Sequence, residues 1–222
     1  GAATALYGLR GANGVVIITT KSGQKGALRV NFTSTIGTES VNRFPEMQDQ
    51  YTIGYGGVYN PSDFFPSWGP SVAEAKAQDP THPDRLYNHF EDAYRNGMQY
   101  RNGLTFSGGS DKVTFSSSLS HLKHEGVLPY TDYENISARV NTDVTFSNKF
   151  RMGASLNFIN SGGDRYNADR FNEMLSYWSP RYDVTDFETA EGTMNTYGND
   201  NPIYAAKTNK LKDNVNRLVG GF

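Results

Sequence analysis

The chain contains no cysteine, no long run of apolar residues and no block of like charge. Without cysteine it forms no disulfide bonds and no thiolate metal site, and an oxidising compartment is tolerated without being required. Because no stretch approaches the roughly 18 consecutive apolar residues of a membrane-spanning helix, a membrane role requires strands. The formal net charge of −2 comes from interspersed acidic and basic residues, which gives no electrostatic footprint for nucleic acid.

Aromatic residues and glycine are what the chain does contain in quantity. Aromatic residues make up 13% of the 222 residues, although only 36% are hydrophobic overall. A disordered chain is poor in aromatic residues, so this composition predicts an ordered structure. The length suffices for one ordinary domain with a core, or for part of something larger.

Several segments alternate apolar and polar residues with the period of two that a β-strand requires. The clearest is YENISARVNTDVTFS, in which Ile136, Val140 and Val144 fall on one face and Arg139 and Asn141 on the other. Strands are predicted at residues 27–37, 100–108, 112–122, 134–146 and 149–160, with a sixth from Val215.

Two folds accommodate strands of this kind. A soluble β-sandwich buries its apolar faces between two sheets, whereas an outer-membrane barrel turns them toward lipid and keeps polar side chains in its lumen. The length of the strands favours the barrel, because strands of about 9 to 11 residues span a membrane and globular proteins typically use about five or six.

The connections between the strands also favour the barrel. Tight hairpins at GGSDK and SNKF alternate with long loops at 38–99, 123–133 and 161–214. Short turns on one side and long loops on the other are typical of an up-and-down barrel with periplasmic turns and extracellular loops. Six strands are too few to close a membrane barrel, so the chain is expected to be a fragment.

The segment LYGLRGANGVVIITTKSG, residues 6–23, resembles the end of the plug domain in SusC/RagA-type TonB-dependent outer-membrane transporters. Three later segments are similar to the same family in the same order. They are LTFSGGSDKVTFSSSLSHLKHEGVLP, YENISARVNTDVTF with FRMGASLNF, and DNPIYAAKTNKLKDNVNRLVGG.

The resemblance implies an all-β fold, a transmembrane antiparallel up-and-down β-barrel, of which this chain is one portion of a roughly 22-stranded plugged barrel. Residues 1–26 would be the C-terminal end of the plug and a connector, and residues 27–222 the first six barrel strands with their loops. The apolar run Val15–Ile18 suits a plug strand buried on both faces. The structural plug motif comprises Tyr7, Gly8, Arg10, Gly11, Asn13 and Gly14.

The resemblance also implies a function, namely energy-coupled import of a bulky nutrient, a glycan or an oligopeptide, without enzymatic chemistry or a cofactor. The implied location is the outer membrane of a Gram-negative, Bacteroidota-like cell, in contact with its lipid. The implied partners are a SusD-like lipoprotein over the extracellular loops and TonB, which would engage a segment upstream of Gly1. Pairs of barrel–lipoprotein units are expected.

Two other functions remain open on the residues alone. One is a soluble β-sandwich module that binds carbohydrate or acts in adhesion. The other is a secreted glycoside hydrolase, which needs two carboxylates about 5 to 10 Å apart, and the sequence singles out no such pair.

No metal site is predicted from the clusters of metal-ligating residue types. A strand places His121 and His124 on opposite faces, and Glu125 beside them adds no third ligand in a suitable position. The segment with Asp164, Asn167 and Asp169 offers calcium ligands but lacks the EF-hand spacing.

The long loops are rich in aromatic residues, which stack on sugar rings or on a partner surface, or pack the loops against one another. SVAEAKAQD predicts a short helix, and a second helix is predicted where Phe171, Met174, Leu175 and Trp178 fall on one helical face. The candidate substrate or partner contacts are Tyr55, Tyr59, Phe65, Trp68, Arg165, Tyr166 and Trp178.

Overall fold

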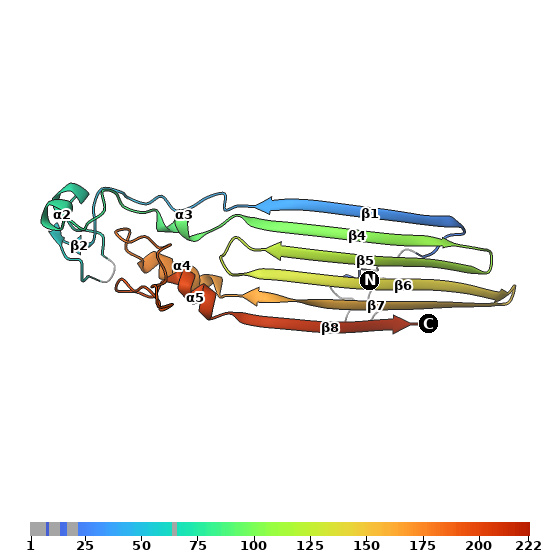
Figure 1. The fold of residues 1–222 in the computed structure, drawn as a ribbon. Helices are drawn as coiled ribbons and strands as arrows, with labels where there is room; N and C mark the ends of the chain where they lie inside the picture. The colour runs from blue at the N-terminus through green and yellow to red at the C-terminus, as the bar shows by residue number, and fades with distance from the viewer. Residues whose placement is uncertain (1–7, 9–13, 17–21, 64–65) are drawn as a thin grey trace.

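The computed structural model describes Gly8 and residues 14–16, 22–63 and 66–222, in which six antiparallel strands form one sheet (Figure 1). The strands follow one another across the sheet in chain order, apart from a two-stranded hairpin in the first long loop. They are β1 (Gly26–Glu39), β4 (Gly97–Gly109), β5 (Val113–Glu125), β6 (Asp132–Ser147), β7 (Phe150–Arg165) and β8 (Leu211–Gly221). The prediction of six strands in up-and-down order is confirmed.

Short and long connections alternate along the sheet, so all three long loops lie at one end and both tight turns at the other (Figure 1). The strands run a few residues further into the loops than predicted, and the connections at this end are therefore 40–96, 126–131 and 166–210; the second has only six residues and is much shorter than the loop predicted at 123–133. Near the loops both faces of the strands carry polar side chains, so the alternation disappears from the sequence. The backbone hydrogen bonds between strands need no particular side chain and continue beyond the alternation, as in the pairing of Glu125 on β5 with Asp132 on β6.

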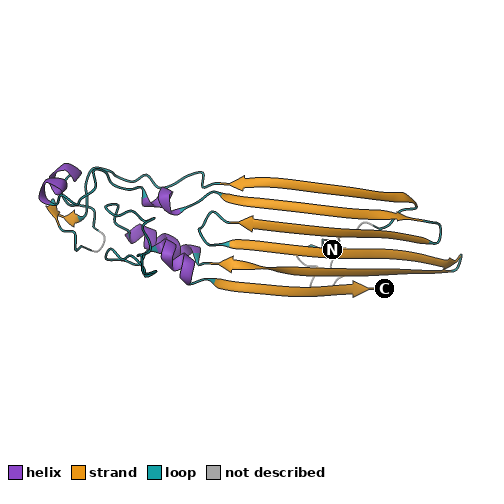
Figure 2. Ribbon diagram, in the orientation of Figure 1, coloured by secondary structure: helices purple, strands orange, loops and turns teal. Residues whose placement is uncertain are grey.

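The α-helices of the described residues, α2 to α5, lie at the loop end of the sheet (Figure 2). The two predicted helices are confirmed as α2 (Val72–Gln78) and α4 (Ala168–Tyr177). The helices α3 (His89–Ala93) and α5 (Pro202–Thr208) and the hairpin of β2 (Gly54–Tyr55) with β3 (Val58–Tyr59) were not predicted. None of the helices in the described part of the chain has the length and apolar character to traverse a bilayer.

The register gives the sheet one apolar face and one polar face. Directly paired residues share a face, so the apolar side chains form continuous rows across the strands. One such row is Leu119, Ala138, Phe158 and Leu218, from β5 to β8. The apolar face is exposed, with 65% of Phe32 and 50% of Leu156 accessible. The described residues provide no second sheet to cover it, so the structure does not support the β-sandwich alternative.

The apolar face has the height of a bilayer core. On β6 the apolar alternation runs from Ile136 to Phe146, which is about 33 Å along a strand. A strand tilted by about 40° then spans about 25 Å, the height of the outward apolar band of outer-membrane barrels.

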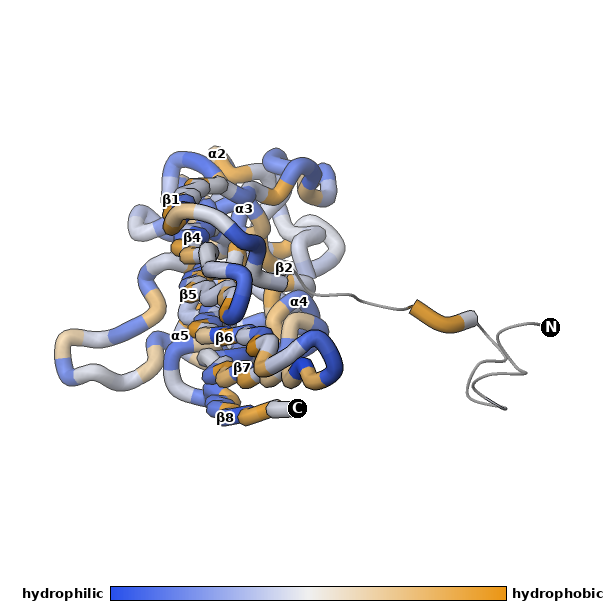
Figure 3. The backbone as a smooth tube through the Cα atoms, turned by 90° about the vertical axis from the view of Figure 1, so that its right-hand side faces the viewer, coloured by the Kyte–Doolittle hydropathy of each residue, from blue (hydrophilic) through white to orange (hydrophobic). Residues whose placement is uncertain are grey.

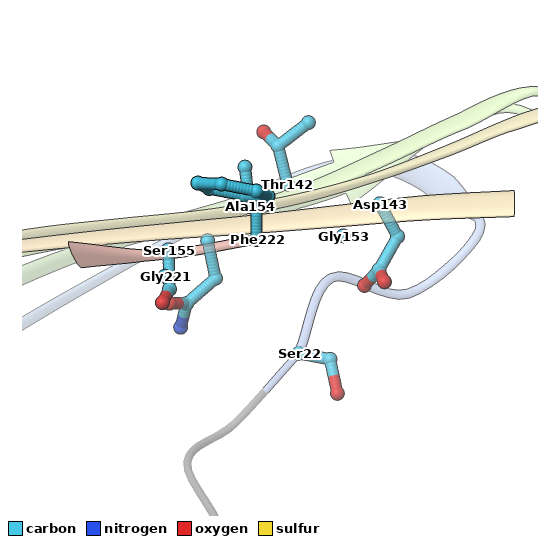
Figure 4. A pocket seen from close by; sticks show the side chains of 9 residues that line it. Ser22, Thr142, Asp143, Gly153, Ala154, Ser155, Gly221 and Phe222 are labelled. Carbon is cyan, nitrogen blue, oxygen red and sulfur yellow. The ribbon is translucent and has the colours of Figure 1, made fainter.

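The segment that leads into β1 lies against the polar face. Figure 4 shows Ser22 on the same side of the sheet as Asp143 and Ser155, with Thr142 and Ala154 on the opposite side. Gly23 approaches β5 so closely that a Cβ atom there would lie 2.3 Å from the backbone nitrogen of Phe115. The polar face of the sheet is therefore the face that meets the chain preceding the strands.

Only part of the glycine-rich motif lies within the described residues. Gly8 and Gly14 have φ angles of 62° and 101°, the left-handed region that favours glycine. Tyr7, Arg10, Gly11 and Asn13 lie outside the described residues.

The apolar run after the motif is also only partly described. Val15 and Val16 stand to one side of the sheet and belong to no strand (Figure 3), so they do not show the strand predicted there. The described residues offer this pair no neighbouring strand, and Ile17 and Ile18 lie outside them.

Opposite faces of β6 should respond differently to charge. In the complete barrel, Val140→Arg places a guanidinium in hydrocarbon and is expected to cost about 2 to 4 kcal/mol of folding stability, whereas Asn141→Arg on the polar face costs less than about 1 kcal/mol. Urea titration of the barrel in lipid vesicles measures both values. Equal costs would show that the two faces are assigned to the wrong sides.

Candidate binding surfaces at the loop end

The three long connections pack into one hydrophobic core, here called the loop core. Each connection contributes to it, the first through Ala93, the second through Leu128 and the third through the remaining members. The third connection supplies Phe171, Leu175, Trp178, Val184, Ile203 and Ala206. Interior packing is thus concentrated in the loops.

Helix α4 is positioned by a side-chain cap and by its apolar face. The Asn167 side chain accepts hydrogen bonds from the backbone N–H groups of Asp169 and Arg170, at 2.9 and 3.1 Å, which satisfies two groups that the first helical turn leaves unpaired. The predicted helical face is buried, including Phe171 and Leu175.

A second small core lies further out in the first connection, and residues 50–82 are called the loop tip. Its buried centre includes Ile53, Ala75 and His82. The His82 Nε2 atom lies 2.7 Å from the Thr52 hydroxyl and Nδ1 lies 2.8 Å from the Pro83 carbonyl oxygen, so both ring nitrogens are satisfied. The tip therefore has its own packing, separate from the loop core.

An ion pair joins the loop tip to the third connection. The Arg181 guanidinium donates to the Asp79 carboxylate at 2.7 Å, and its side chain is only 10% exposed. The Tyr59 hydroxyl donates to the same carboxylate oxygen at 2.8 Å. Hydrogen bonds from Thr81 and Tyr59 lower the pKa of Asp79 to about 2, while burial and the bond to Asp79 raise the pKa of Tyr59 to about 12.

Some of the candidate contact residues serve in packing. Trp178 is 3% exposed and its indole nitrogen donates to the Tyr182 carbonyl at 2.9 Å. Tyr166 packs edge-on against Phe171, with ring centroids 6.4 Å apart. Tyr59 is held in the ion-pair network.

The other aromatic candidates belong to the loop tip. Tyr55 and Trp68 are 74% and 68% exposed, and their segments are joined by the backbone bond from Trp68 to the Gly54 carbonyl at 3.0 Å. Phe65 lies outside the described residues. Thus the structure leaves Tyr55 and Trp68 accessible at the far end of the loops.

A cavity of about 340 Å³, the mouth pocket, lies where the strands meet the loop core. It brings the candidates Arg165 and Tyr166 together with His124, Tyr133 and Leu128. The Arg165 guanidinium lies 3.2 Å from the Asp213 carboxylate, and the His124 Nε2 atom lies 2.9 Å from the Glu39 carboxylate. The pocket therefore offers aromatic surface and charged hydrogen-bonding groups on a scaffold of paired strands.

Tyr133 was missed from the sequence, although a signal for it exists. It is directly paired with His124 across β5 and β6, and both lie on the polar face just beyond the apolar rows. An aromatic residue at the loop end of the polar face is the pattern that would have identified it.

The described residues contain no group of three or more metal-ligating side chains. His121 pairs with Glu134 at 2.7 Å on the apolar side of the register, while His124 pairs with Glu39 on the other. Of the residues considered as calcium ligands, Asp164 forms an ion pair with Lys210 at 2.7 Å, and the Asn167 side chain caps the N-terminus of α4.

No family model matches the chain. Comparison with curated proteins finds similar TonB-dependent receptors over nearly its whole length. TonB-dependent receptor P39 of Formosa agariphila is 26% identical over 230 residues, covering 98% of this chain and 20% of that receptor. TonB-dependent receptor SusC of Bacteroides thetaiotaomicron is 24% identical over 244 residues, covering 98% of this chain and 23% of that receptor.

A solved structure shows the same fold. The RagAB peptide importer in its open-open state superposes with a TM-score of 0.61 at 16% identity, over 99% of this chain and 28% of that one. The resemblance to SusC/RagA-type TonB-dependent receptors is confirmed. The sheet accordingly has the fold of an open portion of an up-and-down barrel like those of these proteins, and this chain spans about a fifth of the length of the two receptors.

One histidine is buried at the loop end of the sheet without a good hydrogen-bond partner. His89 is 1% exposed, packs on Phe90 with ring centroids 4.9 Å apart, and neither ring nitrogen makes a well-formed hydrogen bond. Burial lowers its pKa to about 4, and the nearby Leu175 backbone opposes that shift only weakly. The neutral imidazole is thus the form compatible with the folded loops.

Breaking the ion pair should release the loop tip. Asp79→Asn leaves the nearly buried Arg181 charge without a counterion, and amide exchange in residues 50–82 should rise about tenfold or more. Asp84→Asn makes the same substitution in an exposed pair with Lys76 and should change exchange less than about twofold. Hydrogen exchange with mass spectrometry measures both, and equal effects would contradict the role of Arg181.

The loop core should lose stability on acidification. A folded pKa of about 4, against about 6.5 when exposed, makes the His89 contribution complete above pH 6.5 and lost as the pH falls toward 4. The loss amounts to about 3 kcal/mol. Hydrogen exchange of the backbone amides of residues 168–178, corrected for the pH dependence of the intrinsic exchange rates, measures this loss of stability.

The variant His89→Leu isolates this effect. The other titrating groups are the same in the variant and the parent, so their contributions cancel when the stability of one is subtracted from that of the other. Asp92 in the same helix has a pKa raised by burial and acts in the opposite sense at the acid end. As the pH falls from 6.5 toward 4, the parent should lose stability relative to the His89→Leu variant. Parallel pH profiles for the two proteins would contradict the assignment.

Proposed function

We propose that the protein is a TonB-dependent importer of the outer membrane, that this chain forms the first six strands of its barrel, and that residues 1–26 are the end of its plug and the connector. The observation that carries the proposal is the division of the sheet into two faces. The apolar face is exposed at bilayer height, and the connector lies against the polar face.

The polar face would be the wall of a wet lumen. Between the connector and the wall lies a cavity of about 640 Å³, lined by Ser22, Gln24, Arg29, Asn31 and Thr105 among others. Hydroxyl, amide and guanidinium groups keep this boundary hydrated. They also prevent the apolar packing that would hold a plug tightly against the barrel wall. Such a boundary suits a plug that moves relative to the barrel when TonB acts on it.

The long loops would face the cell exterior and receive the nutrient. The mouth pocket offers Tyr133 and Tyr166 for stacking and Arg165 for polar contact, a combination that serves a glycan or an oligopeptide. The similar RagAB structure is described as a peptide importer, which supports an oligopeptide as one proposed cargo, and aromatic side chains that can stack on sugar rings keep a glycan as the other.

A SusD-like lipoprotein is the proposed partner above the loops. The exposed Tyr55 and Trp68 stand at the loop tip, where aromatic residues provide contact area at low conformational cost. TonB would engage a segment preceding Gly1, and a pair of barrel–lipoprotein units is the proposed assembly. Transport would be displacement of the plug driven by the inner membrane, with no bond of the substrate broken.

Extraction of the native protein tests this proposal. We expect a chain about as long as SusC, recovered from outer membranes in mild detergent together with a lipoprotein, and uptake of its nutrient that stops when TonB is deleted. The mass of the complex and peptide sequencing of its components give the result. A water-soluble product without membrane association, or uptake independent of TonB, would contradict the proposal.

A further inference from the structure

The apolar face changes character abruptly toward the loops. The last continuous apolar row, Leu119–Ala138–Phe158–Leu218, is followed by three rows that are mostly polar. The first is His121, Ile136, Asn160 and Asn216; the second is Lys123, Glu134, Gly162 and Asn214; the third contains Glu125, Asp132, Asp164 and Lys212. If the apolar rows meet hydrocarbon, the row that contains Ile136 lies at their boundary, and the two rows beyond it lie at the level of the lipid headgroups of the outer leaflet.

A hollow of about 280 Å³ is built into these rows, and we call it the Gly162 hollow. Its floor is Gly162, the one position of the second row without a side chain. A Cβ atom on Gly162 would lie 2.1 Å from the Asp213 carbonyl oxygen, so the close approach of β7 and β8 keeps this position open. The lining groups are Lys123, Asp132, Glu134, Asn160, Asp164, Lys212 and Asn214.

The lining is ordered by contacts between the strands. Asn160 donates to the side-chain oxygens of Asn214 and Asn216, each at 2.8 Å. Glu134 is held by His121 at 2.7 Å, and Asp132 accepts from the Asp164 backbone N–H at 2.8 Å. Asn160, Glu134 and Asp132 are therefore held in place before any ligand arrives, whereas the half-exposed Lys123 lies 3.4 Å from Glu125 and would turn toward the ligand.

The charges around the hollow select the class of ligand. Lys123 on β5 and Lys212 on β8 flank it, and Asp132 and Glu134 lie on β6 between them; Asp164 on β7 also lines it and is already paired with Lys210 at 2.7 Å. An isolated anion would meet these carboxylates, and an isolated cation would meet the lysines. A group that carries both signs a few ångströms apart satisfies each side, because charged hydrogen bonds are stronger than neutral ones.

We propose that the Gly162 hollow binds the headgroup of an outer-leaflet lipid in which a phosphate stands next to a primary amine. The phosphate contacts Lys123 and Lys212, the ammonium contacts Glu134 and Asp132, and the acyl chains lie along the apolar rows below. This inference rests on the proposed function, since it requires the apolar face to lie in a bilayer.

Lipid retention by the complete barrel tests the inference. The barrel is reconstituted with equal amounts of phosphatidylethanolamine, phosphatidylcholine and phosphatidylglycerol, and lipids retained on the extracted protein are counted by native mass spectrometry. Phosphatidylethanolamine should be retained about tenfold over the other two, because choline cannot donate a hydrogen bond and glycerol lacks the positive charge.

Single substitutions assign the site to the hollow. Glu134→Gln and Lys212→Gln should each reduce the preference to about twofold or less, while Lys149→Gln at the opposite, turn end of the barrel should leave it unchanged. Heat-dependent gel mobility confirms that each variant folds, as expected for exposed positions.

The outcomes separate this inference from the function on which it rests. An inserted barrel that retains the three lipids equally, that prefers phosphatidylglycerol, or that keeps its preference in both hollow variants would overturn the headgroup site alone. Failure of the barrel to insert into the bilayer would overturn the membrane function and the headgroup site together.

Discussion

Backbone hydrogen bonding between neighbouring strands is the interaction on which the rest of the structure depends, because the bilayer in which we propose the sheet lies would offer its N–H and C=O groups no water. Each strand of the six-stranded sheet is paired with its neighbour in the order β1, β4, β5, β6, β7 and β8, although β8 pairs with β7 only over Ser155–Arg165. Because each pair is antiparallel and consecutive, tight turns collect at one end and the long connections at the other. The irregular backbone is thereby confined to the end where water and other loops satisfy it.

The same constraint moves the protein's own hydrophobic core out of the barrel wall. Apolar strand residues such as Phe32 and Leu156 point outward, so they contribute nothing to an interior. The fully buried side chains, including Phe171, Leu175 and Val184, come from the loops instead. Consequently the loops are held by their own packing, and the wall by its hydrogen-bond ladder.

The sequence allowed the wall to be predicted and the loops only in part. Alternation in segments such as Ile136–Phe146 separates the apolar from the polar side of each strand and predicted the faces, while the alternation of short and long connections predicted the strand order and the tight turns. Where both faces become polar, as from Lys123 to Glu125, the signal ends before the strand does. The Arg181–Asp79 pair joins residues 102 positions apart, and no local pattern reveals such a contact. Arg165 and Tyr166 were among the candidate contact residues, but the pocket that they share with His124 and Tyr133 was not predicted, because strand register brings these residues together.

The loop architecture also determines where motion can occur without dismantling the site. The mouth pocket is built on paired strands and on the loop core, to which all three connections contribute, so displacing one wall of it requires unpacking the others. The loop tip carries its own small core around Ile53 and is joined to the third connection through Arg181 and Tyr182. A body with an internal core and few attachments moves as a unit when those attachments break. Tyr55 and Trp68 ride on this body, so a partner that binds them can shift relative to the mouth while the groups that line the mouth pocket stay in position.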